Sequence, residues 1–168
     1  MISDSSIKWI ENLAEQEGLI LAGELPQLDI SRTREEVLAV GTTVFMRELK
    51  SHGLSLSKFF NSRMKEPLLC ISWGDVSERP DGFFLERNSV RLSVTSVASG
   101  TIQIKCEKRS AELPSKASTL FSGVLEARFS NFDEVTWYFL EKPINAEQFS
   151  RYYLTEFLQN SRALDRLL

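Results

Sequence analysis

The segment Asn88–Arg109, NSVRLSVTSVASGTIQIKCEKR, decides the fold of this chain. Apolar and polar residues alternate on both sides of a small-residue turn that ends at Gly100. The apolar members of the alternation are Val90, Leu92, Val94, Ile102, Ile104 and Cys106. A period of two is typical of strands with one buried and one solvated face, so the segment predicts an antiparallel hairpin. Its apolar face needs cover, which we expect the flanking helical segments to provide.

Upstream of the hairpin the pattern is helical. Ser5–Glu17 predicts a first helix, capped by Ser5 or Ser6 and ended at Gly18. The run Leu19–Ala22 that follows is short and apolar, and it fits either a strand or a buried connector.

A capping box at Thr33–Glu36 predicts a second helix that runs to about Ser51 and ends at Gly53. A third, short helix is expected over Ser55–Met64, because Pro67 prevents further helix. The stretch Met46–Phe60 resembles the first two helices of a helix-turn-helix regulator. The chain continues with Lys65, Glu66 and Pro67 instead of a basic recognition helix, so we do not expect nucleic acid as a partner.

Strand patterns fill the region after Pro67. Besides the hairpin, strands are predicted at Leu68–Trp73, Phe83–Arg87, Thr119–Phe129 and Val135–Leu140. The first of these is apolar on both faces and is therefore expected in the centre of the sheet. A capping signal at Asn145–Gln148 then opens a closing helix that runs to about Leu167.

This order of elements predicts an α+β fold: an antiparallel meander of about six strands, open or curled into a half-barrel, with N-terminal helices and one long C-terminal helix packed on it. At 168 residues and 42% hydrophobic, the chain has the size of one domain. We expect a single domain over residues 1–168, with 1–66 mainly helical, 67–141 forming the sheet and 144–168 the last helix.

The net charge of −3 argues against a protein that neutralises many phosphates. Residues 1–30 carry one Lys and six acidic residues, whereas residues 31–66 carry seven Lys or Arg and four acidic residues. The two segments could pack together, or they could steer a charged partner. The N-terminus is not typical of a signal peptide, and no apolar run is long enough to span a membrane, so a cytoplasmic protein without a membrane partner is expected.

The sequence contains few residues in the patterns that catalysis requires. His52 is the only histidine, and its position beside Gly53 predicts that it caps a helix end. Asp75, Glu78 and Asp81 share one polar loop, where solvated charges are the simplest interpretation. Cys70 and Cys106 make no disulfide framework or zinc pattern, and no glycine-rich phosphate loop is present. We therefore assign no catalytic residue, metal ligand or cofactor.

These observations favour a non-catalytic interaction protein, such as a small acidic chaperone, adaptor or immunity-type binder, with a protein partner or a second copy in a homodimer. Its size, acidity and order of elements are similar to those of small bacterial secretion chaperones. The residues expected to bind the partner are aromatic: Tyr152, Tyr153, Phe157 and Trp137. The alternative is a small-molecule binder or enzyme with an apolar pocket between the sheet and the helices. That pocket would be lined by Trp73, Phe84, Trp137 and Phe139.

Overall fold

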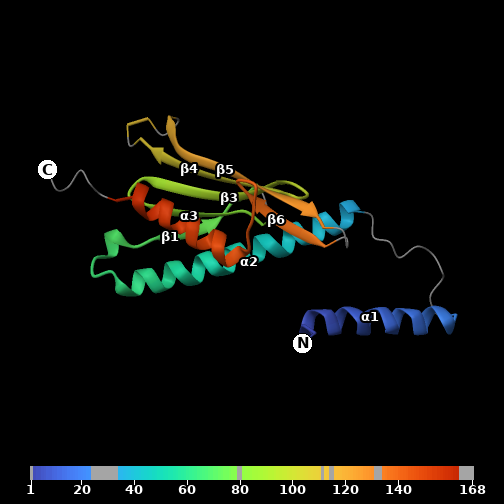
Figure 1. Cartoon of the computed structure of the whole chain (residues 1–168). Coiled ribbons are helices and arrows are strands. Elements are labelled where there is room, and N and C mark those ends of the chain that lie inside the picture. The colour runs from blue at the N-terminus through green and yellow to red at the C-terminus, as the bar shows by residue number, and fades with distance from the viewer. Residues whose placement is uncertain are drawn as a thin grey trace. The chain divides into compact units, whose positions relative to one another are not determined.

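The computed structural model describes residues 2–23, 34–78, 81–110, 112–113, 116–130 and 134–162 (Figure 1). The chain forms two compact units, Met1–Thr33 and Arg34–Leu168, and each is described by itself. The single domain expected over residues 1–168 stays a prediction. In the described residues, no helix is both long and apolar enough to cross a membrane.

The first unit contains helix α1, Asp4–Leu21, which is longer than the helix predicted from the sequence. The cap is Ser3 rather than Ser5 or Ser6, because the Ser6 N–H donates to the Ser3 hydroxyl at 3.3 Å. Gly18 lies inside the helix, and Gly23, with a φ of 72°, follows its end. Leu19–Leu21 are therefore helical, and the alternative of a strand at Leu19–Ala22 is wrong.

The second unit begins with one continuous helix, α2, Arg34–Arg63, where two helices were predicted. Gly53 lies inside this helix instead of ending it. It is buried there and packs against the side chains of Tyr153 and Phe83. The resemblance to a helix-turn-helix fails for the same reason, and His52 lies in a helix interior instead of at a cap. Thr33, the predicted hydroxyl of the capping box, lies outside the described residues.

Among the described residues, seven antiparallel strands follow, in the spatial order β1-β2-β3-β4-β5-β6-β7, and the sheet that they form is not closed. Their bounds are β1 Ser72–Asp75, β2 Phe83–Arg87, β3 Val90–Ala98, β4 Thr101–Arg109, β5 Ala117–Phe129, β6 Val135–Phe139 and β7 Lys142–Pro143. The predicted α+β meander is confirmed, with slightly more strands than expected. The hairpin predicted over Asn88–Arg109 is β3 and β4, in which Leu92 pairs with Cys106 and Val94 with Ile104.

The one strand that was misplaced is the first. Pro67–Leu69 forms a 3₁₀ turn, and β1 is a short edge strand instead of a buried central one. The reason is local: the Asn61 side chain bonds both the N–H and the C=O of Ile71, at 2.7 and 2.9 Å. The Ile71 backbone is thereby satisfied by α2. Leu68 points away from the core and is 69% exposed.

Helix α3, Ala146–Asn160, lies beside α2 on one face of the sheet (Figure 1). The predicted capping signal is confirmed, since the Asn145 side chain accepts from the Gln148 N–H while the Gln148 side chain accepts from the Asn145 N–H. The helix ends at Asn160, earlier than expected, and residues 163–168 lie outside the described residues.

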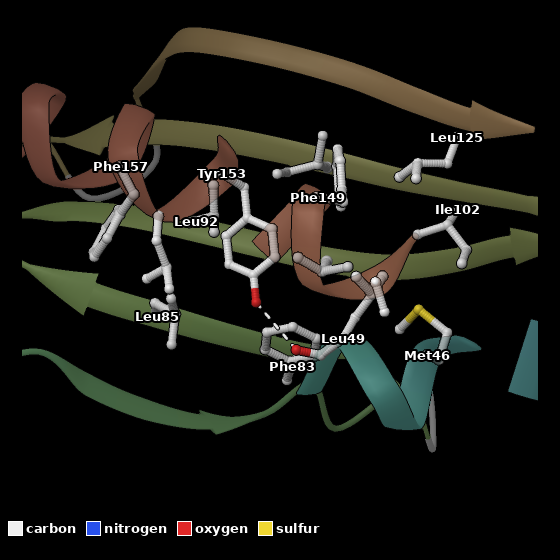
Figure 2. Packing of buried hydrophobic residues seen from close by; sticks show 14 of the residues in the cluster. Met46, Leu49, Phe83, Leu85, Leu92, Ile102, Leu125, Phe149, Tyr153 and Phe157 are labelled. Atoms are coloured by element: carbon white, nitrogen blue, oxygen red, sulfur yellow. Dashed lines mark hydrogen bonds between the residues drawn. The ribbon is translucent and has the colours of Figure 1, made fainter. Parts of the chain in front are cut away.

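The core lies between these two helices and the sheet (Figure 2). Its largest buried side chains include Met46, Leu49, Phe83, Leu85, Leu92, Ile102, Leu125, Phe149, Tyr153 and Phe157. At its centre the Tyr153 hydroxyl donates a hydrogen bond of 3.1 Å to the Leu49 carbonyl, which joins α3 to α2. Burial raises the pKa of the Tyr153 hydroxyl above its ordinary value, so the group stays protonated and able to donate.

Candidate functional site

The aromatic residues predicted to bind a partner are mostly inside the protein. Tyr153 and Phe157 are fully buried, and Trp137 is nearly so, with its ring stacked on that of Phe45 at a centroid distance of 4.6 Å. Tyr152 is the exception: it is 37% exposed and packs against Phe139 at 5.0 Å. The partner-binding role of the four residues stays a prediction; Tyr152 is the one whose side chain reaches the surface, whereas the other three contribute to the core of this fold.

The four residues of the predicted ligand pocket do not come together. Trp73 pairs with Leu85 and thus faces the helices, where Lys58 lies 5.9 Å from its ring. Phe84 pairs with Gly74 on the opposite face, under the guanidinium of Arg91 at 4.0 Å. Trp137 and Phe139 make separate contacts with α2 and α3, through Phe45 and Phe149 respectively.

The acidic residues of the predicted polar loop, Asp75, Glu78 and Asp81, are exposed or half-buried. Asp75 forms an ion pair with Lys50, and Glu78 is exposed at the turn. Among the described residues, no group of three or more His, Cys, Asp or Glu is placed to hold a metal ion. Burial raises the pKa of the Cys106 thiol to about 12, which keeps it protonated and a poor nucleophile.

A different surface stands out: a groove between the C-terminal half of α2 and α3. It has a volume of about 470 Å³. The residues that line it are Leu56, Phe59, Phe60, Arg63, Ile71, Arg151, Leu154, Thr155 and Leu158. We call this surface the α2/α3 groove.

The groove is built by two matching rows of side chains. On each helix the lining residues stand at the spacing i, i+3, i+4, i+7, beginning at Leu56 on α2 and at Arg151 on α3. Residues at this spacing share one helix face, so the groove lies between two parallel ridges of side chains. Phe59 is the most exposed aromatic residue in it, at 63%. Leu56, on the same helix face, is also exposed, so the two side chains form a contiguous apolar surface in a concavity, which is a feature that marks interaction sites.

Positive charge accompanies this apolar surface. The lining includes two arginines and no carboxylate. The guanidinium of Arg63 lies over the ring of Phe59 at 5.1 Å, and Arg151 bonds Glu147 one turn earlier on α3 at 2.6 Å. The guanidinium of Arg87 lies over the ring of Phe60, 5.4 Å from its centre, and donates to the Leu69 carbonyl. Partial burial lowers the pKa of Arg87 from its ordinary value.

Phe59 and Phe60 are adjacent in the short helix predicted over Ser55–Met64. Adjacent residues on a helix point about 100° apart, so only one of the pair can face the core directly. The Phe59-Phe60 doublet was thus the available signal for an exposed aromatic residue.

Comparison of the chain with protein-family models, curated proteins and solved structures finds no match.

Proposed function

We propose that the protein is a non-catalytic protein-binding module whose α2/α3 groove receives an amphipathic, acidic helix of a partner protein. The observation that carries the proposal is the exposed, apolar and cationic lining of the groove. A helix placed between two helical ridges contacts both of them through residues at i, i+3, i+4 and i+7. Its apolar side chains would cover Phe59 and Leu56.

Charge supports the acidic character of the partner. Arg63 and Arg151 lie on opposite walls of the groove, one on each helix. Arg151 is already paired with Glu147, whereas Arg63 forms no ion pair within the described residues. Carboxylates flanking the apolar face of a partner helix could reach both guanidinium groups. Such pairs set orientation and association rate more than they set affinity.

The experiment replaces Phe59 with a photo-crosslinking phenylalanine derivative in the full-length protein inside cells. Phe59 is largely exposed, so the substitution should change the free energy of unfolding by no more than about 0.5 kcal/mol. The matched control carries the same group at Val97, which is 42% exposed on β3. We expect a partner that is cross-linked from position 59 only, with the attachment site mapped by mass spectrometry to an amphipathic helix bearing acidic residues.

A synthetic peptide of the mapped segment provides the second measurement. It should bind the wild-type protein and bind Arg63→Glu at least tenfold more weakly, with an affinity that falls as salt rises. Attachment to a basic or non-helical segment, attachment within the protein's own chain, or equal cross-linking from positions 59 and 97 would each refute the proposal.

A further inference from the structure

We infer that Arg87 and Arg162 form a binding site for a phosphate group where the end of β2 meets the end of α3. The guanidinium of Arg87 faces the helices, because it lies over the ring of Phe60 on α2. Its Nε donates to the Leu69 carbonyl at 2.9 Å, and its Nη1 donates to the Ser161 hydroxyl at 3.3 Å. Among the described residues, its Nη2 has no hydrogen-bond acceptor, so these N–H groups are available to a ligand.

Arg87 has no counter-ion in the described part of the chain. Its neighbour Glu86 points to the other face of the sheet, since successive residues of a strand alternate, and it is paired with Arg91 at 2.7 Å. Burial lowers the pKa of Arg87, and the positive charge of Arg162 lowers it further. A bound anion would offset both effects, because it attracts the two guanidinium groups that repel each other.

Ser161 fixes the backbone from which Arg162 extends. It is 1% exposed and accepts two hydrogen bonds from the end of β2 and the turn that follows. Arg87 donates to its hydroxyl, and the side chain of Asn88 donates to its carbonyl at 2.7 Å. Arg162 comes directly after Ser161 and is exposed. Its starting point is thus held beside Arg87 before any ligand binds, which reduces the entropy that binding costs.

Two guanidinium groups suit a phosphate better than a carboxylate. A phosphate monoester has three terminal oxygens and a charge of about −1.5 to −2 at neutral pH. Arg87 and Arg162 belong to different elements, and each can donate to different oxygens of one phosphate. A carboxylate has only two oxygens, which a single bidentate arginine already occupies.

NMR titration of the full-length protein with inorganic phosphate, at about pH 7.5 and constant ionic strength, tests the inference. The signal to follow is the Nε–H group of Arg87, whose proton is held by the Leu69 carbonyl. We expect a saturable shift with a dissociation constant of about 1–10 mM. Acetate, the carboxylate probe, should bind about fivefold more weakly or not at all.

A matched pair of variants locates the site. Arg162→Gln removes one guanidinium from an exposed position and should weaken phosphate binding by about fivefold. The control Arg47→Gln makes the same change of charge at an exposed residue of α2, about 20 Å along the helix from Phe60, and should bind as the wild type does. Equal weakening in both variants, no saturable shift up to about 50 mM phosphate, or acetate binding as tight as that of phosphate would overturn the inference.

A third probe distinguishes the source of the phosphate group. N-acetyl-O-phosphoserine amide stands for a phosphorylated side chain of another protein. Binding at least as tight as that of inorganic phosphate supports such a side chain, whereas weaker binding supports the free anion. Neither Arg87 nor Arg162 lines the α2/α3 groove, and the titrations contain no partner protein, so this site and the proposed function can fail separately.

Discussion

Gly53 offers the most informative test of how the core is built. A Cβ atom at this position would overlap the Tyr153 hydroxyl, while the Tyr153 Cζ would be 3.4 Å away and the Phe83 ring 3.6 Å away. The hydroxyl is the tip of a rigid, fully buried ring and cannot move aside without losing its bond to the Leu49 carbonyl. We expect Gly53→Ala to destabilise the protein even though alanine is the better helix former.

The magnitude follows from three opposing effects. Alanine in place of glycine in a helix interior stabilises by about 0.5–1 kcal/mol. Overpacking a filled core costs about 1–3 kcal/mol. Loss of the hydrogen bond between Tyr153 and Leu49 costs about 1 kcal/mol more. The free energy of unfolding of Gly53→Ala should therefore fall by about 1–3 kcal/mol.

The matched background is Tyr153→Phe, which removes only the hydroxyl. The atoms left near the new Cβ would then lie at ordinary contact distances, 3.4 and 3.6 Å. In this background Gly53→Ala should stabilise the protein by up to about 1 kcal/mol, so the effect of the same substitution changes sign. Urea unfolding, followed by circular dichroism, of the wild type, the two single variants and the double variant measures the free energy of unfolding of each. Equal destabilisation in both backgrounds, or a stabilised Gly53→Ala single variant, would refute this account of the packing.

Three further outcomes are expected. Burial raises the pKa of Cys106 in the folded protein to about 12. The Cys106 thiol of the unfolded protein therefore loses its proton at a lower pH than that of the folded protein. The free energy of unfolding should then fall above about pH 9 by up to about 1.4 kcal/mol per pH unit, and urea titrations of Cys106→Ala should show a flatter slope. Asn145→Ala removes the cap of α3 and should cost about 1 kcal/mol in thermal unfolding; an unchanged melting temperature would contradict that role. Asn61→Ala loses both bonds to Ile71 and should cost about 2 kcal/mol and speed amide exchange at Ile71. Asn61→Asp keeps the acceptor for the Ile71 N–H but places a carboxylate oxygen where the amide donated to the Ile71 carbonyl, so it should not restore the lost stability.

The strands could be predicted because their signal is local. Alternation along β3 and β4 placed every predicted apolar residue of that hairpin in the core. The helix cap at Asn145 could be predicted equally well, since its partner Gln148 lies three residues away. The errors concern residues whose environment is set by a contact with another element. Ile71 belongs to an apolar run that fits a central strand, but Asn61 of α2 satisfies its backbone.

The candidate site could be predicted only in part. The density of aromatic residues on the last helix was visible, but the sequence could not show that Tyr153 and Phe157 point into the core. A helix face becomes core or surface according to what packs on it. The α2/α3 groove exists because α2 continues through Gly53 and runs beside α3. Two separate helices, as predicted, would not have placed Phe59 and Arg63 opposite Arg151.

The amino-acid sequence alone thus determined the α+β class, the meander order of the strands and the amphipathic faces, since alternation and capping act between residues a few positions apart. Tertiary structure alone decided that Gly53 is a point of close approach instead of a helix end. The structural role of Gly53 depends on Tyr153, whose hydroxyl donates a hydrogen bond to a residue 104 positions earlier in the chain. Tertiary structure also decided that Phe59 is left in water while Phe157 is buried, because burial is a property of the packed assembly of elements and not of any one segment.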